Sequence, residues 1–151
     1  MRALQYRIYG GPEVLEWAEA PDPHPGPGQL RVAVRAASVN PIDWKTIGGA
    51  MAGGKPMQGT GYLGYDAAGV VDEVGEGVTG VAVGDEVFGR GRNTQAESAV
   101  LDSWAAKPPA IDWAVAAAAG VAGETAEFDR AAEAYRISQA GHIRGKLVLV
   151  P

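Results

Sequence analysis

The sequence predicts a β-rich α+β protein: a partly open β-barrel with a few peripheral helices and no doubly wound nucleotide-binding sheet. Its 151 residues are enough for one domain with a core of its own. Its 22 glycines and 10 prolines exceed average usage and favour many tight turns. At least five short apolar or alternating segments lie between such turns. Closure into a barrel is the usual way for short strands to avoid exposed edges.

The N-terminal part predicts three strands. Residues Met1–Tyr9 and Val14–Ala18 are separated by Gly10-Gly11-Pro12, which is typical of two strands joined in a hairpin. The prolines between residues 21 and 27 cannot join a ladder, so we expect a stiff loop there. The next segment predicts a half-buried strand, because apolar residues recur at every second position. Its buried face carries Leu30, Val32, Val34 and Ala36.

The segment Asn40-Pro41-Ile42-Asp43 predicts the start of a helix. Asparagine suits the N-cap, proline suits the first helical position, and a carboxylate is favoured near the exposed amides. Gly48-Gly49 ends this helix, and the glycine-rich stretch from residue 49 to 64 follows as a surface loop. Further strands are predicted at Ala67–Val74, Glu86–Phe88 and Ala96–Leu101.

The last third of the chain predicts two helices and a final strand, in contrast to the strands predicted before it. The alanine-rich segment Asp112–Ala119 predicts a helix. A second helix is expected over Asp129–Ala140, with Asp129 as N-cap and Gly141 as its stop. Lys146–Val150 is a final apolar strand. Because this strand has no sheet of its own, we expect it to pair with the N-terminal barrel.

Charge and composition exclude several classes of function. The net charge is −5 and no run of lysines or arginines is present, so neither nucleic acid nor a membrane surface is an expected partner. No apolar stretch reaches the roughly 18 residues of a spanning helix, and the N-terminus lacks the apolar core of a signal peptide. We therefore expect a cytoplasmic protein. The absence of cysteine excludes disulfides, thiolate metal sites and a cysteine nucleophile.

Two segments, Gly59–Gly64 and Gly75–Gly80, match the pattern G-x-G-x-x-G. In a dinucleotide fingerprint the glycine turn joins a parallel strand to a helix whose N-terminal amides hold the pyrophosphate. Here each match leads into a predicted strand. We therefore interpret both as turn glycines.

Other polar residues have simpler interpretations than catalysis. His24 and His142 have no serine or carboxylate partner placed for general base chemistry, so we expect both at the surface. The acidic residues Asp72, Glu73 and Glu76 are interpreted as a solvated turn rather than a cation site.

A family resemblance is carried by Gly64-Tyr65-Asp66-Ala67-Ala68-Gly69, by Gly75 and by Gly84-Asp85-Glu86-Val87. These segments resemble the GroES-like catalytic domain of the medium-chain dehydrogenase/reductase superfamily. In its zinc alcohol dehydrogenases, a histidine after the first glycine and a preceding cysteine bind the catalytic metal. Here Tyr65 stands in the place of the histidine and no cysteine exists. The resemblance therefore implies that no metal is bound.

The segment from Asn40 to Asp43 resembles the N-x-x-D motif of the zinc-independent quinone oxidoreductase branch. The resemblance implies that Asn40, Asp43 and Trp44 lie at the floor of the substrate and nicotinamide cleft. It makes Asn40, Asp43 and Tyr65 candidates for catalysis, Tyr65 as a hydrogen-bond donor to a substrate carbonyl. It also makes Asn40, Trp44 and Thr125 candidates for residual coenzyme contact. Helix capping alone also explains Asn40 and Asp43, and the two interpretations are compatible.

The resemblance covers nearly the whole chain but only about half of the family architecture. Residues 128–135 and 141–149 resemble the extreme C-terminus of the same enzymes, where the chain returns to the catalytic domain. Between the two parts the family carries about 130 to 150 residues of nucleotide-binding domain. We therefore expect residues 1–151 to form a single GroES-like domain, in which residues 1–126 are joined directly to residues 128–151. The junction lies near Gly123–Phe128, and whether the deletion is engineered or natural stays open.

Two functions follow from these observations. The first is the catalytic domain of a zinc-independent NADPH-dependent quinone or enone oxidoreductase, which acts on a small molecule in the intact family. Alone it should be inactive or nearly so and bind no coenzyme, because the fold that holds the pyrophosphate is absent. The second is a non-enzymatic binding or self-assembling module, a possible homo-oligomer formed through apolar surface uncovered near Trp113 and the alanine-rich helix.

Overall fold

The computed structural model describes residues 1–118, 125–127, 130–140 and 147–150, with backbone alone for residues 125–127 and 147. The strands are β1 (Arg2–Tyr6), β2 (Glu16–Glu19), β3 (Leu30–Val39), β4 (Gly61–Tyr62), β5 (Asp66–Val74), β6 (Glu86–Arg92), β7 (Ser98–Ala106), β8 (Thr125–Glu127) and β9 (Leu147–Val150). The helices are the 3-10 turn η1 (Pro12–Val14), α1 (Pro41–Ile47), α2 (Trp113–Ala117) and α3 (Ala131–Ala140).

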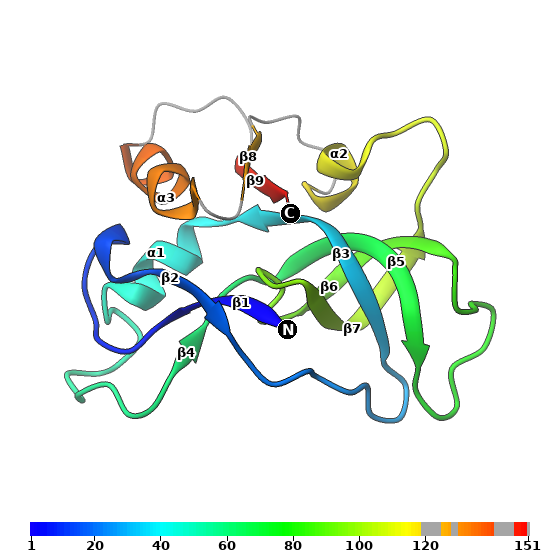
Figure 1. The fold of residues 1–151 in the computed structure, drawn as a ribbon, viewed down its shortest axis with the longest axis horizontal. Coiled ribbons are helices and arrows are strands. Elements are labelled where there is room, and N and C mark those ends of the chain that lie inside the picture. The colour runs from blue at the N-terminus through cyan, green and yellow to red at the C-terminus, as the bar shows by residue number, and fades with distance from the viewer. Residues whose placement is uncertain (119–124, 128–129, 141–146, 151) are drawn as a thin grey trace.

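The centre of the fold is the long strand β3 (Figure 1). One of its edges pairs with β5, and β5 pairs with β6, which pairs with β7. The first half of the other β3 edge pairs with β7, so that β3, β5, β6 and β7 close a ring. The second half of that edge pairs with β9. These pairings confirm the predicted partly open barrel.

The burial pattern of β3 follows its neighbours. Leu30, Val32 and Val34 are buried, as predicted, and Arg35 points to solvent. From Ala36 to Val39 every residue is buried, because both faces of the strand are covered there. Ala36 belongs to the small cluster beneath α2, and the following apolar residues on the opposite face belong to the main core.

The predicted N-terminal hairpin is confirmed, with shorter strands than expected. β1 pairs antiparallel with β2, and its other edge pairs with β4, which the predicted 49–64 loop contributes. The link between β1 and β2 is not a tight turn. Pro12 occupies the first turn of η1, and the N–H of Gly10 donates to the carbonyl of Ile47 at 2.9 Å. The long link therefore ties the hairpin to α1.

The helices cover two parts of the barrel (Figure 1). α3 contacts η1 and α1, and it contributes Ala131, Ala134 and Tyr135 to the main core. α2 is shorter than predicted and begins after Asp112, whose carboxylate accepts the N–H of Val115 at 2.7 Å. Ala116 and Ala117 of this helix are buried, and the helix packs against β3, β5 and β9. The predicted cap Asp129 and stop Gly141 lie outside the described residues.

The C-terminal strand pairs with the barrel as predicted, with Ala37 opposite Leu149 and Val39 opposite Leu147. On its other side β9 pairs in parallel with β8, a short strand that the sequence pattern does not reveal. β8, α3 and β9 thus form one parallel strand–helix–strand unit. Of the expected junction near residues 123–128, the structure describes residues 125–127 alone.

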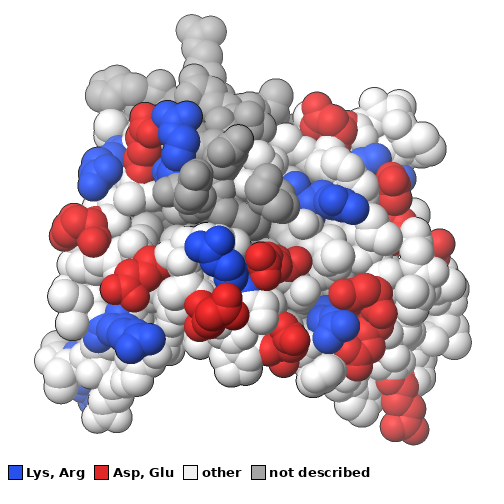
Figure 2. Space-filling view, in the orientation of Figure 1, with Lys and Arg blue, Asp and Glu red and all other residues white. Residues whose placement is uncertain are grey.

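Charges of both signs are interspersed on the surface in Figure 2. The guanidinium of Arg31 pairs with Asp72 and Glu73, each at 2.8 Å, and His24 lies 3.0 Å from Glu73. Asp72 and Glu73 therefore have a protein cation as partner, and they lie in β5 rather than in the predicted turn, which contains Glu76. None of the helices in the described part of the chain has the length and apolar character needed to cross a membrane.

Candidate functional site

The candidate site begins at the N-terminus of α1. The backbone N–H of Asn40 donates to the carboxylate of Asp43 at 2.7 Å, and the N–H of Asp43 donates to the carbonyl of Asn40 at 2.9 Å. Pro41 occupies the first helical position, where its missing N–H costs no hydrogen bond. The capping interpretation of Asp43 is therefore confirmed. The Asp43 side chain is fully buried.

The side chain of Asn40 has a different set of partners. Its amide nitrogen donates to the Asp66 carboxylate at 2.9 Å and to the Ser38 hydroxyl at 3.1 Å. The Ser38 hydroxyl in turn donates to the same Asp66 oxygen at 3.0 Å. These bonds join the end of β3 to the start of β5 and fix the orientation of the Asn40 amide.

Asn40 and Asp66 line a hollow of about 540 Å³ with Pro41, Ile42, Tyr65 and Arg90. The Tyr65 phenol and the Arg90 guanidinium are hydrogen-bond donors, which suit a ligand carbonyl oxygen. Arg90 is the cross-strand partner of Asp66 between β6 and β5. The structure therefore brings two predicted site residues, Asn40 and Tyr65, to one hollow.

A smaller hollow of about 280 Å³ shares Asp66 and Arg90 with the first one and extends toward α2. Its remaining wall is mostly apolar and includes Phe88, Trp104, Ala116 and Ala117. Together the two hollows offer a polar end beside α1 and an apolar end beside α2. A planar molecule with one polar edge matches this division.

The other predicted site residues lie elsewhere. Asp43 is fully buried below the hollow, where its second oxygen accepts the N–H of Gly64 at 3.2 Å. Trp44 is partly buried against the main core, and the Lys45 ammonium lies 5.5 Å from the centre of its ring. The backbone of Thr125 lies in β8, and its side chain is outside the described part of the structure.

Sequence reasoning missed a buried polar pair beneath the site. The amide nitrogen of Gln95 donates to the Ser38 carbonyl at 3.0 Å and lies 3.5 Å from the Asp43 carboxylate. The Tyr135 hydroxyl donates to the Gln95 amide oxygen at 2.7 Å. Burial and the nearby charge of Asp43 raise the pKa of Tyr135 well above its usual value. No local pattern in the sequence identifies either residue.

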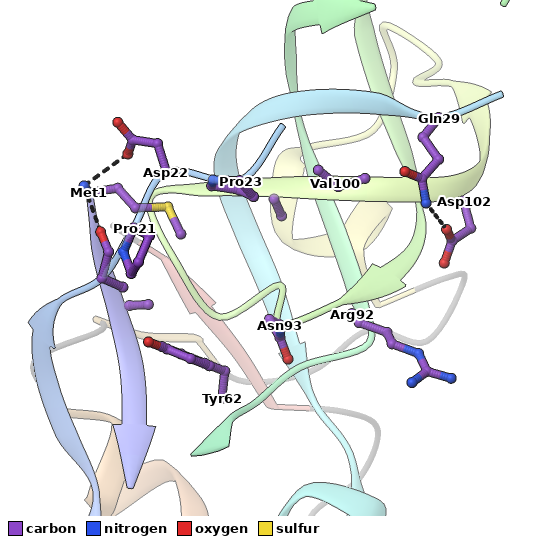
Figure 3. Close-up of a pocket in the computed structure, with 13 residues that line it drawn as sticks. Met1, Pro21, Asp22, Pro23, Gln29, Tyr62, Arg92, Asn93, Val100 and Asp102 are labelled. Carbon is purple, nitrogen blue, oxygen red and sulfur yellow. Dashed lines mark hydrogen bonds and ion pairs between the residues drawn. The ribbon is translucent and has the colours of Figure 1, made fainter. Parts of the chain in front are cut away.

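A separate hollow, also of about 540 Å³, lies between the N-terminus, the proline-rich loop and β7 (Figure 3). Its polar groups are largely paired with each other. The terminal ammonium of Met1 lies 2.9 Å from Asp22, and the Gln29 amide donates to Asp102 at 2.6 Å. This hollow contains none of the residues predicted for the site.

The described residues do not fit a catalytic metal. No group of three histidine, aspartate or glutamate side chains gathers closely enough in this part of the chain to hold an ion. At the position of the family's metal ligand, Tyr65 instead lines the hollow with a phenol, which donates a hydrogen bond and is a poor zinc ligand.

The described residues do not fit the pyrophosphate of a dinucleotide either. Such a site needs a glycine turn between a parallel strand and a helix. In the β8–α3–β9 unit, the residues between strand and helix are Phe128-Asp129-Arg130, which include a carboxylate and no glycine. The two glycine motifs lie instead before β5 and between β5 and β6, with positive φ at Gly64 and Gly77. Gly59 and Gly80 also have positive φ, as expected of turn glycines, whereas Gly61 lies in β4.

Comparison with known proteins agrees with this architecture. Residues 26–138 match the alcohol dehydrogenase GroES-like domain family. The chain is 35% identical over 133 residues to a chloroplast envelope quinone oxidoreductase homolog of Arabidopsis thaliana. That match covers 83% of this chain and 40% of the relative, so the chain spans about two fifths of the relative's length.

Two solved quinone oxidoreductases share the fold. A mycobacterial enzyme superposes with a TM-score of 0.69 at 32% identity, over 79% of this chain and 37% of that chain. The Escherichia coli enzyme, solved in complex with NADPH, gives a TM-score of 0.65 at 29% identity, over 78% of this chain and 36% of that chain. The chain therefore belongs to the alcohol dehydrogenase GroES-like domain family and, within it, to the quinone oxidoreductase-like medium-chain dehydrogenases/reductases.

Proposed function

We propose that this chain is the substrate-side domain of a zinc-independent, NADPH-dependent quinone or enone oxidoreductase. The observation that carries the proposal is the hollow at the start of α1, where Asn40, Tyr65 and Arg90 meet. The relatives support the reaction class, since those described above are quinone oxidoreductases and one was solved with NADPH. Zinc independence is supported by Tyr65 at the position of the metal ligand.

The residues of the hollow bind and orient the substrate. The Tyr65 hydroxyl and the Arg90 guanidinium donate hydrogen bonds to a carbonyl oxygen, which gains negative charge when the carbonyl compound is reduced. Asn40 is held by Asp66 and Ser38, so its amide presents a fixed dipole at the rim. The apolar wall formed by Phe88 and Trp104 receives the ring or chain of the substrate.

We propose further that the chain alone is inactive or nearly so. Residues 1–126 and 128–151 form one GroES-like domain, and the nucleotide-binding domain of the family is not among them. Substrate orientation is therefore separated from coenzyme binding, since the residues described here do not fit a pyrophosphate. No step of hydride transfer is assigned to this chain.

Quinone binding tests the assignment of the hollow. In Tyr65→Phe the affinity for a simple naphthoquinone, measured by NMR titration, should fall about 2- to 10-fold because one hydrogen bond is lost. The matched control is Tyr62→Phe, since Tyr62 lines the separate hollow near the N-terminus. Equal affinities of the two variants would contradict the assignment.

A further inference from the structure

A chain of hydrogen bonds connects α3 to the N-terminus of α1 through the interior of the barrel. It begins at the Tyr135 hydroxyl, which donates to Gln95 at 2.7 Å. The amide nitrogen of Gln95 donates to the Ser38 carbonyl at 3.0 Å, with Asp43 at 3.5 Å. Asp43 accepts the backbone N–H of Asn40. The chain thus links Tyr135 with Asn40, which is far from it in the sequence and lines the hollow.

The three side chains that form this chain of hydrogen bonds are inaccessible to solvent. Tyr135, Gln95 and Asp43 are each fully buried. In such an environment an unpaired polar group is costly, so a fully paired network favours a single arrangement of its members. The raised pKa of Tyr135 keeps its hydroxyl protonated at neutral pH. Because the Gln95 amide nitrogen donates to the Ser38 carbonyl, its oxygen is the atom that accepts from the Tyr135 hydroxyl.

The same network holds the loop before Tyr65. The N–H of Gly64 donates to Asp43 at 3.2 Å. Gly64 has a φ of +99°. A Cβ there would lie 2.5 Å from the Thr94 hydroxyl oxygen and 2.7 Å from the backbone nitrogen of Gln95. This close approach requires glycine. Asp43 therefore fixes two segments at once, the Asn40 side and the Tyr65 side of the hollow.

We propose that Tyr135 and Gln95 are positioning residues, through which α3 sets the orientation of Asp43 and hence of Asn40 at the candidate site. Neither residue lines the hollow, so neither touches the substrate directly. The importance of this arrangement for catalysis rests on the proposed function. The arrangement itself is a property of the folded chain and is tested without substrate or coenzyme.

The sequence offers a clean spectroscopic probe, because it contains two asparagines, Asn40 and Asn93. Asn93 is exposed and lies on the separate hollow shown in Figure 3. In protein labelled with 15N-asparagine, the backbone N–H groups of the two residues report on the site and on a distant surface. Tyr135→Phe removes the hydroxyl alone and keeps the ring that packs in the core.

In Tyr135→Phe the backbone N–H signal of Asn40, which donates to Asp43, should shift and exchange with water about fivefold faster, as expected when one hydrogen bond of its network is weakened. The Asn93 signals should not change. The control Tyr9→Phe, altered at a ring that packs against Tyr6 and Gly49, should leave both backbone signals unchanged. Unchanged Asn40 signals in a folded Tyr135→Phe protein would overturn the proposal, and so would equal changes at both asparagines.

A second variant keeps the test decisive if Tyr135→Phe does not fold. The double variant Tyr135→Phe/Gln95→Leu removes the Gln95 amide oxygen together with its donor, and it also removes the donor to the Ser38 carbonyl. It should give the same selective change at Asn40. Quinone affinity measured on the same samples separates the two claims. Loss of the Asn40 effect refutes positioning, whereas absence of quinone binding in the unaltered protein refutes the proposed function alone.

Discussion

Asp43 is a buried carboxylate that stabilises the start of α1 and the loop at Gly64. It accepts backbone N–H groups of Asn40 and Gly64, at 2.7 and 3.2 Å. Asp43→Asn places an amide nitrogen where an acceptor is needed. We expect the free energy of unfolding to fall by about 1.5–3 kcal/mol, the range for hydrogen bonds to a charged group, as measured by urea unfolding. Asp102→Asn, at an exposed carboxylate bonded to Gln29, should change it by less than about 0.5 kcal/mol.

The raised pKa of Tyr135 predicts that the folded protein loses stability at alkaline pH. Burial, and secondly the charge of Asp43, raise the pKa of Tyr135 in the folded protein, whereas tyrosine in unfolded chains titrates near pH 10. A raised pKa means that the folded state favours the protonated form. This contribution to stability is complete below about pH 10 and is lost as the pH rises toward the folded pKa.

Urea unfolding of the unaltered protein and Tyr135→Phe at several pH values from 8 to 11 measures this effect. The unaltered protein should lose stability more steeply above about pH 10. Burial also raises the pKa of Tyr6, but Tyr6 is present in both proteins, so the difference between the two curves isolates Tyr135. Parallel curves would show that Tyr135 titrates with an ordinary pKa.

At the scale of single residues, the sequence predicted part of the candidate site. Asn40 and Tyr65 were predicted from their motifs, and the structure places both on one hollow. Gln95 and Tyr135 were not predicted, because their hydrogen bond joins positions 40 residues apart. A hydrogen bond between such distant residues produces no periodic pattern of polar or apolar residues in either segment. It depends on how α3 packs against the barrel.

At the scale of elements, β9 is the strand that joins the C-terminal part to the barrel. It pairs with β3, and Leu149 is fully buried in the main core. Leu149→Ala should lower the free energy of unfolding by about 2–5 kcal/mol. Val150→Ala, at a partly buried position, should cost clearly less.

The unfolding experiment also tests whether the two parts fold together. Three of the four tryptophans lie in residues 1–104, and all four precede β9 in the sequence. If the chain is one cooperative unit, Leu149→Ala will shift a single unfolding transition seen by tryptophan fluorescence. A fluorescence transition that is unaffected by Leu149→Ala would indicate that the C-terminal part unfolds separately.

The longer elements were predictable because their patterns have a physical cause. The alternation in β3 and the cap and stop signals of α1 correspond to observed bounds within a few residues. β4 and β8 have two and three residues, too few to show a period. The apolar surface expected near Trp113 and the alanine-rich helix is covered in part, since Trp113 is half-buried. Ala116, Ala117 and Ala118 are buried with Ala36, Ala68 and Val148.

At the scale of the molecule, the barrel contains the candidate substrate hollow, while the described residues do not fit a dinucleotide. The match spans 40% of the length of its Arabidopsis thaliana relative. Affinity for a nicotinamide coenzyme comes largely from the fold that holds its pyrophosphate. We therefore expect substrate binding and coenzyme binding to be separable in this family.

Titration of tryptophan fluorescence with NADPH tests this account most directly. The chain carries four tryptophans, and Trp44 follows the candidate site within α1. The Escherichia coli quinone oxidoreductase, whose structure contains NADPH, serves as the positive control. We predict no saturable change at micromolar coenzyme for this chain, after correction for absorbance by NADPH. Saturation at micromolar NADPH would contradict the central claim that this barrel holds the substrate and not the coenzyme.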